Sequence, residues 1–66
     1  MSVAVNGLPH DLDDGTTVAE LVALLGAPRT GVAVAIDRDV VPRSAWAETV
    51  IADGARVEVL NAVQGG

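Results

Sequence analysis

The sequence ends in two adjacent glycines, Gly65 and Gly66, whose terminal carboxylate has an evident chemical use. A carboxylate held in line with the α-phosphate of ATP, inside another protein's nucleotide site, attacks phosphorus and becomes an acyl adenylate. Glycine suits the narrow path into such a site, because without a Cβ it adopts backbone angles that are closed to other residues. The pair therefore predicts a chain end that a partner enzyme activates. A frayed end without function is the alternative at this point.

His10 is the only histidine, and it stands beside Asp11 and near Asp13 and Asp14. Proton transfer needs an oriented second group and a metal needs several converging ligands, and a short polar run provides neither by itself. The run 11–15 also lacks the spacing of a calcium loop, which places glycine sixth and glutamate twelfth. We predict a solvated turn here and no metal site.

The remaining side chains offer no catalytic constellation. Nucleophilic catalysis has no support, because the candidate hydroxyls have no base nearby in the sequence. These hydroxyls belong to Thr16, Thr17, Ser44 and Thr49. The chain has no cysteine, and its glycines are scattered at turn positions instead of forming a phosphate loop. We therefore predict no catalytic residue, no cofactor and a protein that is not itself an enzyme.

The segment 41–46, "VPRSAW", contains an arginine and the only aromatic residue. Trp46 is expected to fill the core, because an aromatic ring buries a large area where a small core needs filling. Arg43 is the candidate for a contact with a partner. A surface ion pair with Asp39 or Glu48, which would contribute little, is the alternative for Arg43.

Composition narrows the class of protein. The 66 residues fit one domain covering 1–66, and the formal net charge is −5, with nine acidic residues against four basic ones. All four basic residues are arginine, and this balance disfavours a nucleic-acid partner. No apolar run approaches the ~20 residues of a membrane helix, and the N-terminus lacks a secretory segment. We expect a cytoplasmic protein without membrane contact.

The N-terminal third predicts a hairpin followed by a helix. Residues 2–6 alternate as a half-buried strand with Val3 and Val5 on one face, residues 7–9 form a turn, and residues 10–12 return antiparallel. Thr17 and Glu20 form a capping box, after which we predict a helix over 18–25. Its buried stripe is Val18, Leu21, Val22 and Leu25. Gly26 and Pro28 end it.

The rest of the chain predicts three more strands. Residues 32–36 are a strand without a polar face, and a turn at 37–39 leads to a short strand at Val40 and Val41, which Pro42 confines to a sheet edge. Ser44 is expected to cap one helical turn through residue 47. Residues 56–60 alternate as the last strand, with Val57 buried together with either Leu60 or Val59.

These elements predict an α+β domain in which a mixed sheet of about four to five strands packs on one helix. Pairing the first and last strands in parallel would put the last strand at the centre of the sheet. Residues 62–66 would then leave a rigid anchor as a flexible tail, with a reach of roughly 17 Å if extended.

The order of elements and several motifs resemble one known family over essentially the whole chain. The hairpin, "TVAELV", "VAVAIDRDVVPRSAW", "DGARVEVLNAV" and the terminal Gly-Gly are similar to the sulfur carriers of thiamine biosynthesis. The most specific parts are "AIDRDVVPRSAW" and the pair Gly65-Gly66. The resemblance implies a β-grasp, ubiquitin-like fold, which agrees with the element order above.

The resemblance also implies a chemistry. A ubiquitin-activating-type adenylyltransferase would adenylate Gly66, and sulfur from a cysteine desulfurase or a rhodanese-type persulfide would displace AMP to leave a thiocarboxylate. Thiazole synthase would consume that sulfur. Gly65 would be a slender spacer, while Val63 and Gln64 would run through the partner's channel. The absence of cysteine and lysine fits, because the sulfur rides on the chain end and no ε-amine can capture the activated carboxylate.

Two other functions stay open from the sequence. The small subunit of molybdopterin synthase has a similar fold and tail, although such proteins tend to be longer and to have aromatic residues near the tail. The chain could also be a small interaction module that binds through its sheet and is never modified at its end.

Overall fold

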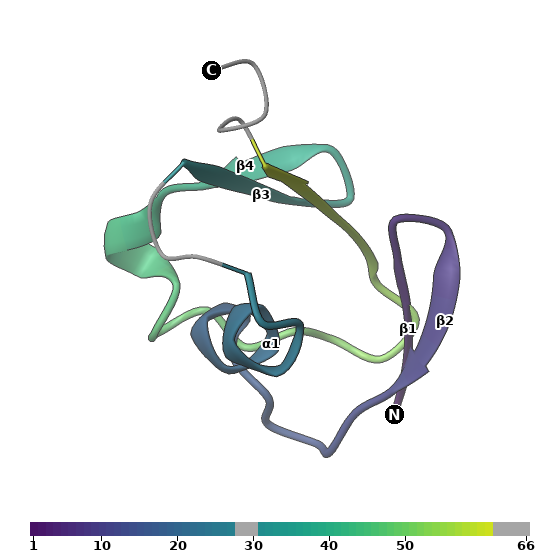
Figure 1. Cartoon of the computed structure of the whole chain (residues 1–66). Helices are drawn as coiled ribbons and strands as arrows, with labels where there is room; N and C mark the ends of the chain where they lie inside the picture. Colours follow the sequence, from purple (N-terminus) through teal and green to yellow (C-terminus); the bar gives the residue numbers. More distant parts are fainter. Residues whose placement is uncertain (28–30, 62–66) are drawn as a thin grey trace.

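The computed structural model describes residues 1–27 and 31–61, and these form one curved sheet around one helix (Figure 1). Five strands lie in the order β2-β1-β5-β3-β4. The helix α1 (Val18–Leu24) lies within the curve of the sheet, and its buried side is Val18, Leu21 and Val22. The predicted α+β class, with a mixed sheet on one helix, is confirmed.

The first hairpin forms earlier than predicted. Strand β1 (Ser2–Val5) pairs antiparallel with β2 (Leu8–Asp11), so that Val5 stands opposite Leu8. The turn is the dipeptide Asn6-Gly7, in which both residues have positive φ (52° and 83°). Asn-Gly is the preferred sequence for such a two-residue turn. The prediction of a turn at 7–9 was therefore wrong, and proline 9 lies in a strand that tolerates it because β2 is a sheet edge.

Helix α1 begins at its predicted cap. The Thr17 side chain accepts a hydrogen bond from the Glu20 N–H (3.2 Å), and the Glu20 carboxylate accepts one from the Thr17 N–H (2.9 Å). The helix ends one residue earlier than predicted, with Leu25 as its C-cap and Gly26 at a φ of +70°. Leu25, which is the C-cap and lies outside the helix, is 38% exposed and so does not complete the buried stripe. Pro28 lies outside the described residues.

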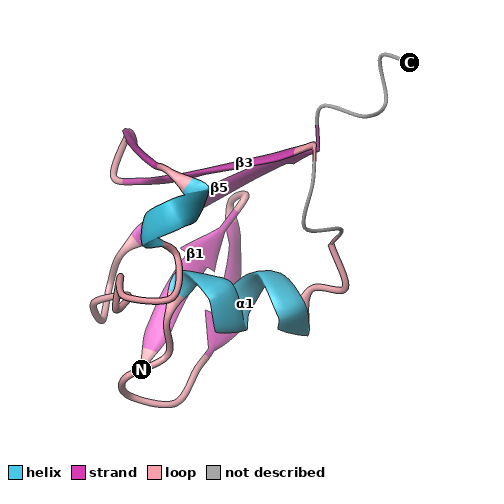
Figure 2. Cartoon of the chain, turned by 90° about the vertical axis from the view of Figure 1, so that its left-hand side faces the viewer, coloured by secondary structure: helices cyan, strands magenta, loops and turns pink. Residues whose placement is uncertain are grey.

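The second hairpin joins β3 (Val32–Ile36) to the edge strand β4 (Asp39–Val41). A 3₁₀ turn, η1 (Arg43–Ala45), follows it (Figure 2). The prediction that Ser44 caps this turn was wrong. Pro42 occupies the cap position without a side-chain hydrogen bond, and Ser44 lies inside the turn, because the turn begins directly after the proline that stops the strand.

Strand β5 (Arg56–Asn61) occupies the centre of the sheet, as predicted. It pairs parallel with β1 and antiparallel with β3. Val57 is fully buried and Val59 is half-buried, whereas Leu60 is 66% exposed, so Val59 is the second inward residue. The core beneath β5 is aliphatic with one ring: Val3, Val5, Leu12, Val18, Leu21, Val22, Val34, Trp46, Ile51, Ala55 and Val57.

Across residues 1–27 and 31–61, no helix has the length and apolar character needed to cross a membrane.

Candidate functional site

The predicted site is the chain end, and the structure describes the strand that leads to it. Val63, Gln64, Gly65 and Gly66 lie outside the described residues, so their roles stay predictions. The last described residue is Asn61, which stands opposite Val32 at the end of the β3–β5 ladder. Any chain that continues beyond Asn61 therefore starts from the most enclosed strand of the sheet.

The two sides of β5 are held differently near this end. On one side β3 pairs with β5 along its length, from Ile36 opposite Val57 to Val32 opposite Asn61. On the other side the ladder with β1 ends at Val5 opposite Val57. Beyond that point, the side chain of Asn6 forms hydrogen bonds to the backbone of Val59, where the next residue of a strand would otherwise pair.

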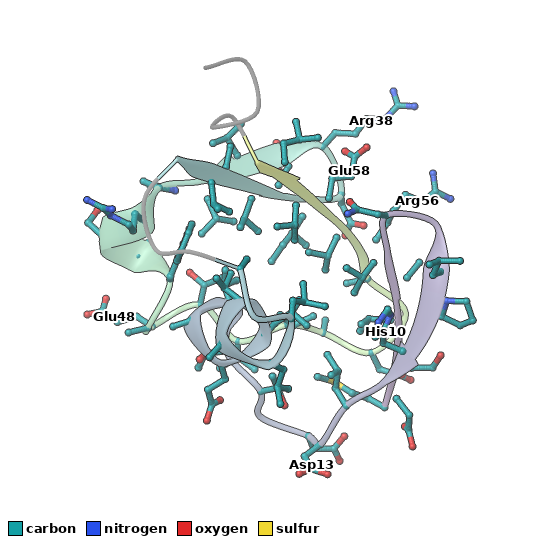
Figure 3. All side chains as sticks on the ribbon, in the orientation of Figure 1. His10, Asp13, Arg38, Glu48, Arg56 and Glu58 are labelled. Carbon is teal, nitrogen blue, oxygen red and sulfur yellow. The ribbon has the colours of Figure 1, made fainter. Side chains whose placement is uncertain are left out.

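The outer face of the sheet carries exposed apolar side chains beside this strand end. Leu60 (66% exposed) stands opposite Ala33 on β3, and Val40 (73% exposed) stands opposite Ala35. Charged residues flank them: Figure 3 shows Arg38, Glu58 and Arg56 pointing away from the helix. This apolar surface with a charged border lies on the outer face of β3, β4 and β5.

Arg43 lies elsewhere, at the edge of a groove between α1 and η1. The groove has a volume of about 450 Å³ and is lined by Ala19, Ala23 and Ala27 of the helix side and by Trp46. Arg43 is exposed, and its contact with a partner stays a prediction. Trp46 is 5% exposed and fills the core, as predicted.

The histidine and its acidic neighbours do not converge. His10 lies on β2 with Nδ1 3.1 Å from the Leu8 carbonyl oxygen, and Figure 3 places it well apart from Asp13. Asp11 and Asp14 face the Met1 ammonium at 3.6 and 3.7 Å. Within residues 1–27 and 31–61, no group of three histidine or acidic residues is arranged to hold a metal ion.

Asn6 is the residue near the site that sequence analysis missed. The Asn-Gly dipeptide was a readable signal for the turn, but its reach to Val59 was not, because 53 residues separate the two in the chain. The contact exists only once β1 and β5 lie side by side.

Comparison with known proteins gives the family. The sequence pattern of the ThiS family matches residues 3–66. The sulfur carrier protein ThiS of Escherichia coli K12 is 32% identical over 66 residues, which cover 100% of both chains. Two proteins named thiazole synthase, from Paramagnetospirillum magneticum and Magnetococcus marinus, are 30% and 33% identical over 66 residues, and the chain spans 20% of the length of each.

Solved structures give the same result. The crystal structure of the thiamine biosynthesis protein ThiS from Geobacter metallireducens matches with a TM-score of 0.83 and 33% identity over 100% of both chains. A solution structure of a thiamine biosynthesis protein from the same organism matches with a TM-score of 0.80 and 35% identity, over 100% of this chain and 88% of the other. These matches confirm the predicted β-grasp fold. The chain, alike in sequence and in fold over its length, belongs to the ThiS family.

Proposed function

We propose that this chain is a sulfur carrier of thiamine biosynthesis and that Gly66 carries the sulfur as a thiocarboxylate. The main support is the match to the ThiS sulfur carrier of E. coli over the whole of both chains. The fold adds a physical reason. The strand that leads toward Gly66 is the central one, paired on both sides at its start, so the body presents the chain end from a rigid base.

The chemistry proceeds in two stages. The Gly66 carboxylate attacks the α-phosphorus of ATP, and the bond from that phosphorus to the β-phosphate breaks. Pyrophosphate is released, and the product is a glycyl adenylate. The terminal sulfur of a persulfide then attacks the carbonyl carbon and AMP leaves. A second thiol reduces the resulting acyl disulfide, so that the thiocarboxylate stays on Gly66 and a disulfide stays on the delivering protein.

Three partners follow from this chemistry. An adenylyltransferase of the ubiquitin-activating type supplies the nucleotide site, and a desulfurase or rhodanese-type protein supplies the persulfide. Two relatives named thiazole synthase contain a segment similar to the whole chain, which supports thiazole synthase as the enzyme that uses the sulfur. The chain itself is then a co-substrate and not an enzyme. A cytoplasmic location stays a prediction.

Intact-protein mass spectrometry tests the proposal. The chain is incubated with the adenylyltransferase, ATP and a persulfide donor, and we expect it to gain the mass difference between a sulfur and an oxygen atom. A chain with one alanine appended after Gly66 is the matched control, because its body is unchanged, and it should stay unmodified. An unmodified wild-type chain under conditions that thiolate another ThiS protein would overturn the proposal.

A further inference from the structure

We propose that Asn6 is a positioning residue, whose side-chain amide extends the β1–β5 ladder and fixes the direction of the last three residues of β5, 59–61. Its purpose at the chain end rests on the function proposed above. The hydrogen bonds that carry the inference do not.

Asn6 makes three hydrogen bonds to β5. Its backbone N–H donates to the Val57 carbonyl oxygen (2.9 Å), which continues the parallel ladder. Its Oδ1 accepts from the Val59 N–H (2.8 Å), and its Nδ2 donates to the Val59 carbonyl oxygen (3.1 Å). The side-chain amide therefore pairs with both backbone polar groups of Val59, as another residue of β1 would.

The turn alone does not require asparagine at this position. Asn6 has a φ of +52°, a conformation that glycine adopts freely and that asparagine and aspartate tolerate. Only the primary amide offers a donor and an acceptor side by side on so short a side chain. The two groups of Val59 also fix which way the amide faces, because its oxygen must meet the N–H and its nitrogen the C=O.

The location gives these bonds their effect. In a ladder of this kind, alternate residues direct their N–H and C=O groups to opposite sides. The Val57 carbonyl group points toward β1, where it accepts from the Asn6 N–H, and the N–H and C=O groups of Val59, two residues later, point to the same side, where the β1 ladder has ended. Without Asn6, the last part of β5 would be held by β3 alone. A strand held on one side can swing about that ladder, whereas a strand held on both sides cannot.

The other end of β5 provides a matched control. Asp37 also begins a turn, with a φ of +50°, and its Oδ1 accepts from the Arg56 N–H (3.0 Å). Asp37 and Asn6 therefore both hold β5 from a hairpin turn, one at its first residue and one near its last. Asn6→Gly removes two side-chain hydrogen bonds to β5 and Asp37→Gly removes one, so both substitutions lower stability, but only Asn6 lies next to the end of the strand.

The test compares Asn6→Gly, Asn6→Asp and Asp37→Gly with the wild-type chain. Backbone amide exchange is read at Val59, with the Leu21 amide of the helix as the internal reference. Asn6→Gly should exchange at Val59 about tenfold faster, which corresponds to one net hydrogen bond. Asn6→Asp should keep only part of that protection, since one carboxylate oxygen still accepts from the Val59 N–H while the other faces the Val59 carbonyl oxygen without a donor. The Leu21 amide should follow global stability only.

The functional arm measures adenylation by the activating enzyme as pyrophosphate release. Asn6→Gly should lower kcat about tenfold with KM little changed, Asn6→Asp should lower it less, and Asp37→Gly should leave it unchanged. Equal losses of kcat in Asn6→Gly and Asp37→Gly would assign the effect to stability and overturn the positioning role. An unchanged rate of amide exchange at Val59 in Asn6→Gly would show that the Asn6 side chain does not hold β5 and would overturn the proposal. If the wild-type chain is never adenylated, the proposed function is wrong. Amide exchange at Val59 alone would then decide whether the Asn6 side chain holds β5.

Discussion

The indole Nε1 of Trp46 donates a 2.9 Å hydrogen bond to the carbonyl oxygen of Val41, which joins the single aromatic ring to the last residue of the edge strand β4. The residue is only 5% exposed, so one side chain both fills volume in the core and holds a strand that pairs on one side only. The hydrogen bond depends on the indole nitrogen, and the filling of the core depends on the size of the ring.

Replacing Trp46 by phenylalanine should therefore destabilise the fold by more than the loss of buried apolar area alone would. The ring shrinks and the Val41 carbonyl oxygen loses its donor, so we expect a cost of about 1 to 3 kcal/mol. The measurement is the urea midpoint followed by far-ultraviolet circular dichroism, because the variant has no tryptophan to report by fluorescence. An unchanged midpoint would show that the hydrogen bond and the ring contribute little.

The capping box gives a second prediction. Thr17→Ala removes the acceptor for the Glu20 N–H, and a lost N-cap costs about 1 kcal/mol. Thr17→Ser keeps the hydroxyl and is the control, which should stay close to wild type. Thermal denaturation of the three proteins checks the order. If alanine and serine were equally stable, the cap would have no role beyond helix geometry.

Local patterns predicted most of the fold for a physical reason. The capping box at Thr17, the break at Gly26 and the alternation of residues 56–60 are set by neighbours in the chain, so they can be read without tertiary information. The first hairpin is predicted two residues too late, because proline usually favours a turn and Pro9 lies in a strand. The edge position that makes proline acceptable in a strand exists only in the assembled sheet.

The candidate site divides in the same way. Gly65 and Gly66 stand out in the sequence, because the use predicted for them depends on their adjacent positions in the chain and not on a residue distant in the sequence. The brace between Asn6 and Val59 could not be predicted, since it joins positions 53 residues apart and needs the parallel register of β1 and β5. Which of Val59 and Leu60 faces inward also needed that register, because both are apolar.

Truncating a side chain to alanine should affect stability differently on the two faces of β5. Val57 is fully buried, so Val57→Ala should cost about 2 kcal/mol, from two lost methyl groups and the cavity that they leave. Leu60 is 66% exposed, and Leu60→Ala should stay within about 0.5 kcal/mol of wild type. Urea titrations with Trp46 fluorescence as the probe measure both. A large loss of stability in Leu60→Ala would mean that the outer face is covered by something in solution.

The tight turn of the first hairpin makes the last prediction. Gly7 has a φ of +83°, and a Cβ placed there would have no atom within 4 Å, so any cost of Gly7→Ala comes from the backbone conformation alone. That cost is about 1 to 2 kcal/mol for a residue with a side chain. Gly7→Asn is the control, because asparagine tolerates this conformation and should lose less. Thermal unfolding of both variants measures the difference, and an alanine variant as stable as the asparagine variant would show that the turn relaxes to another type.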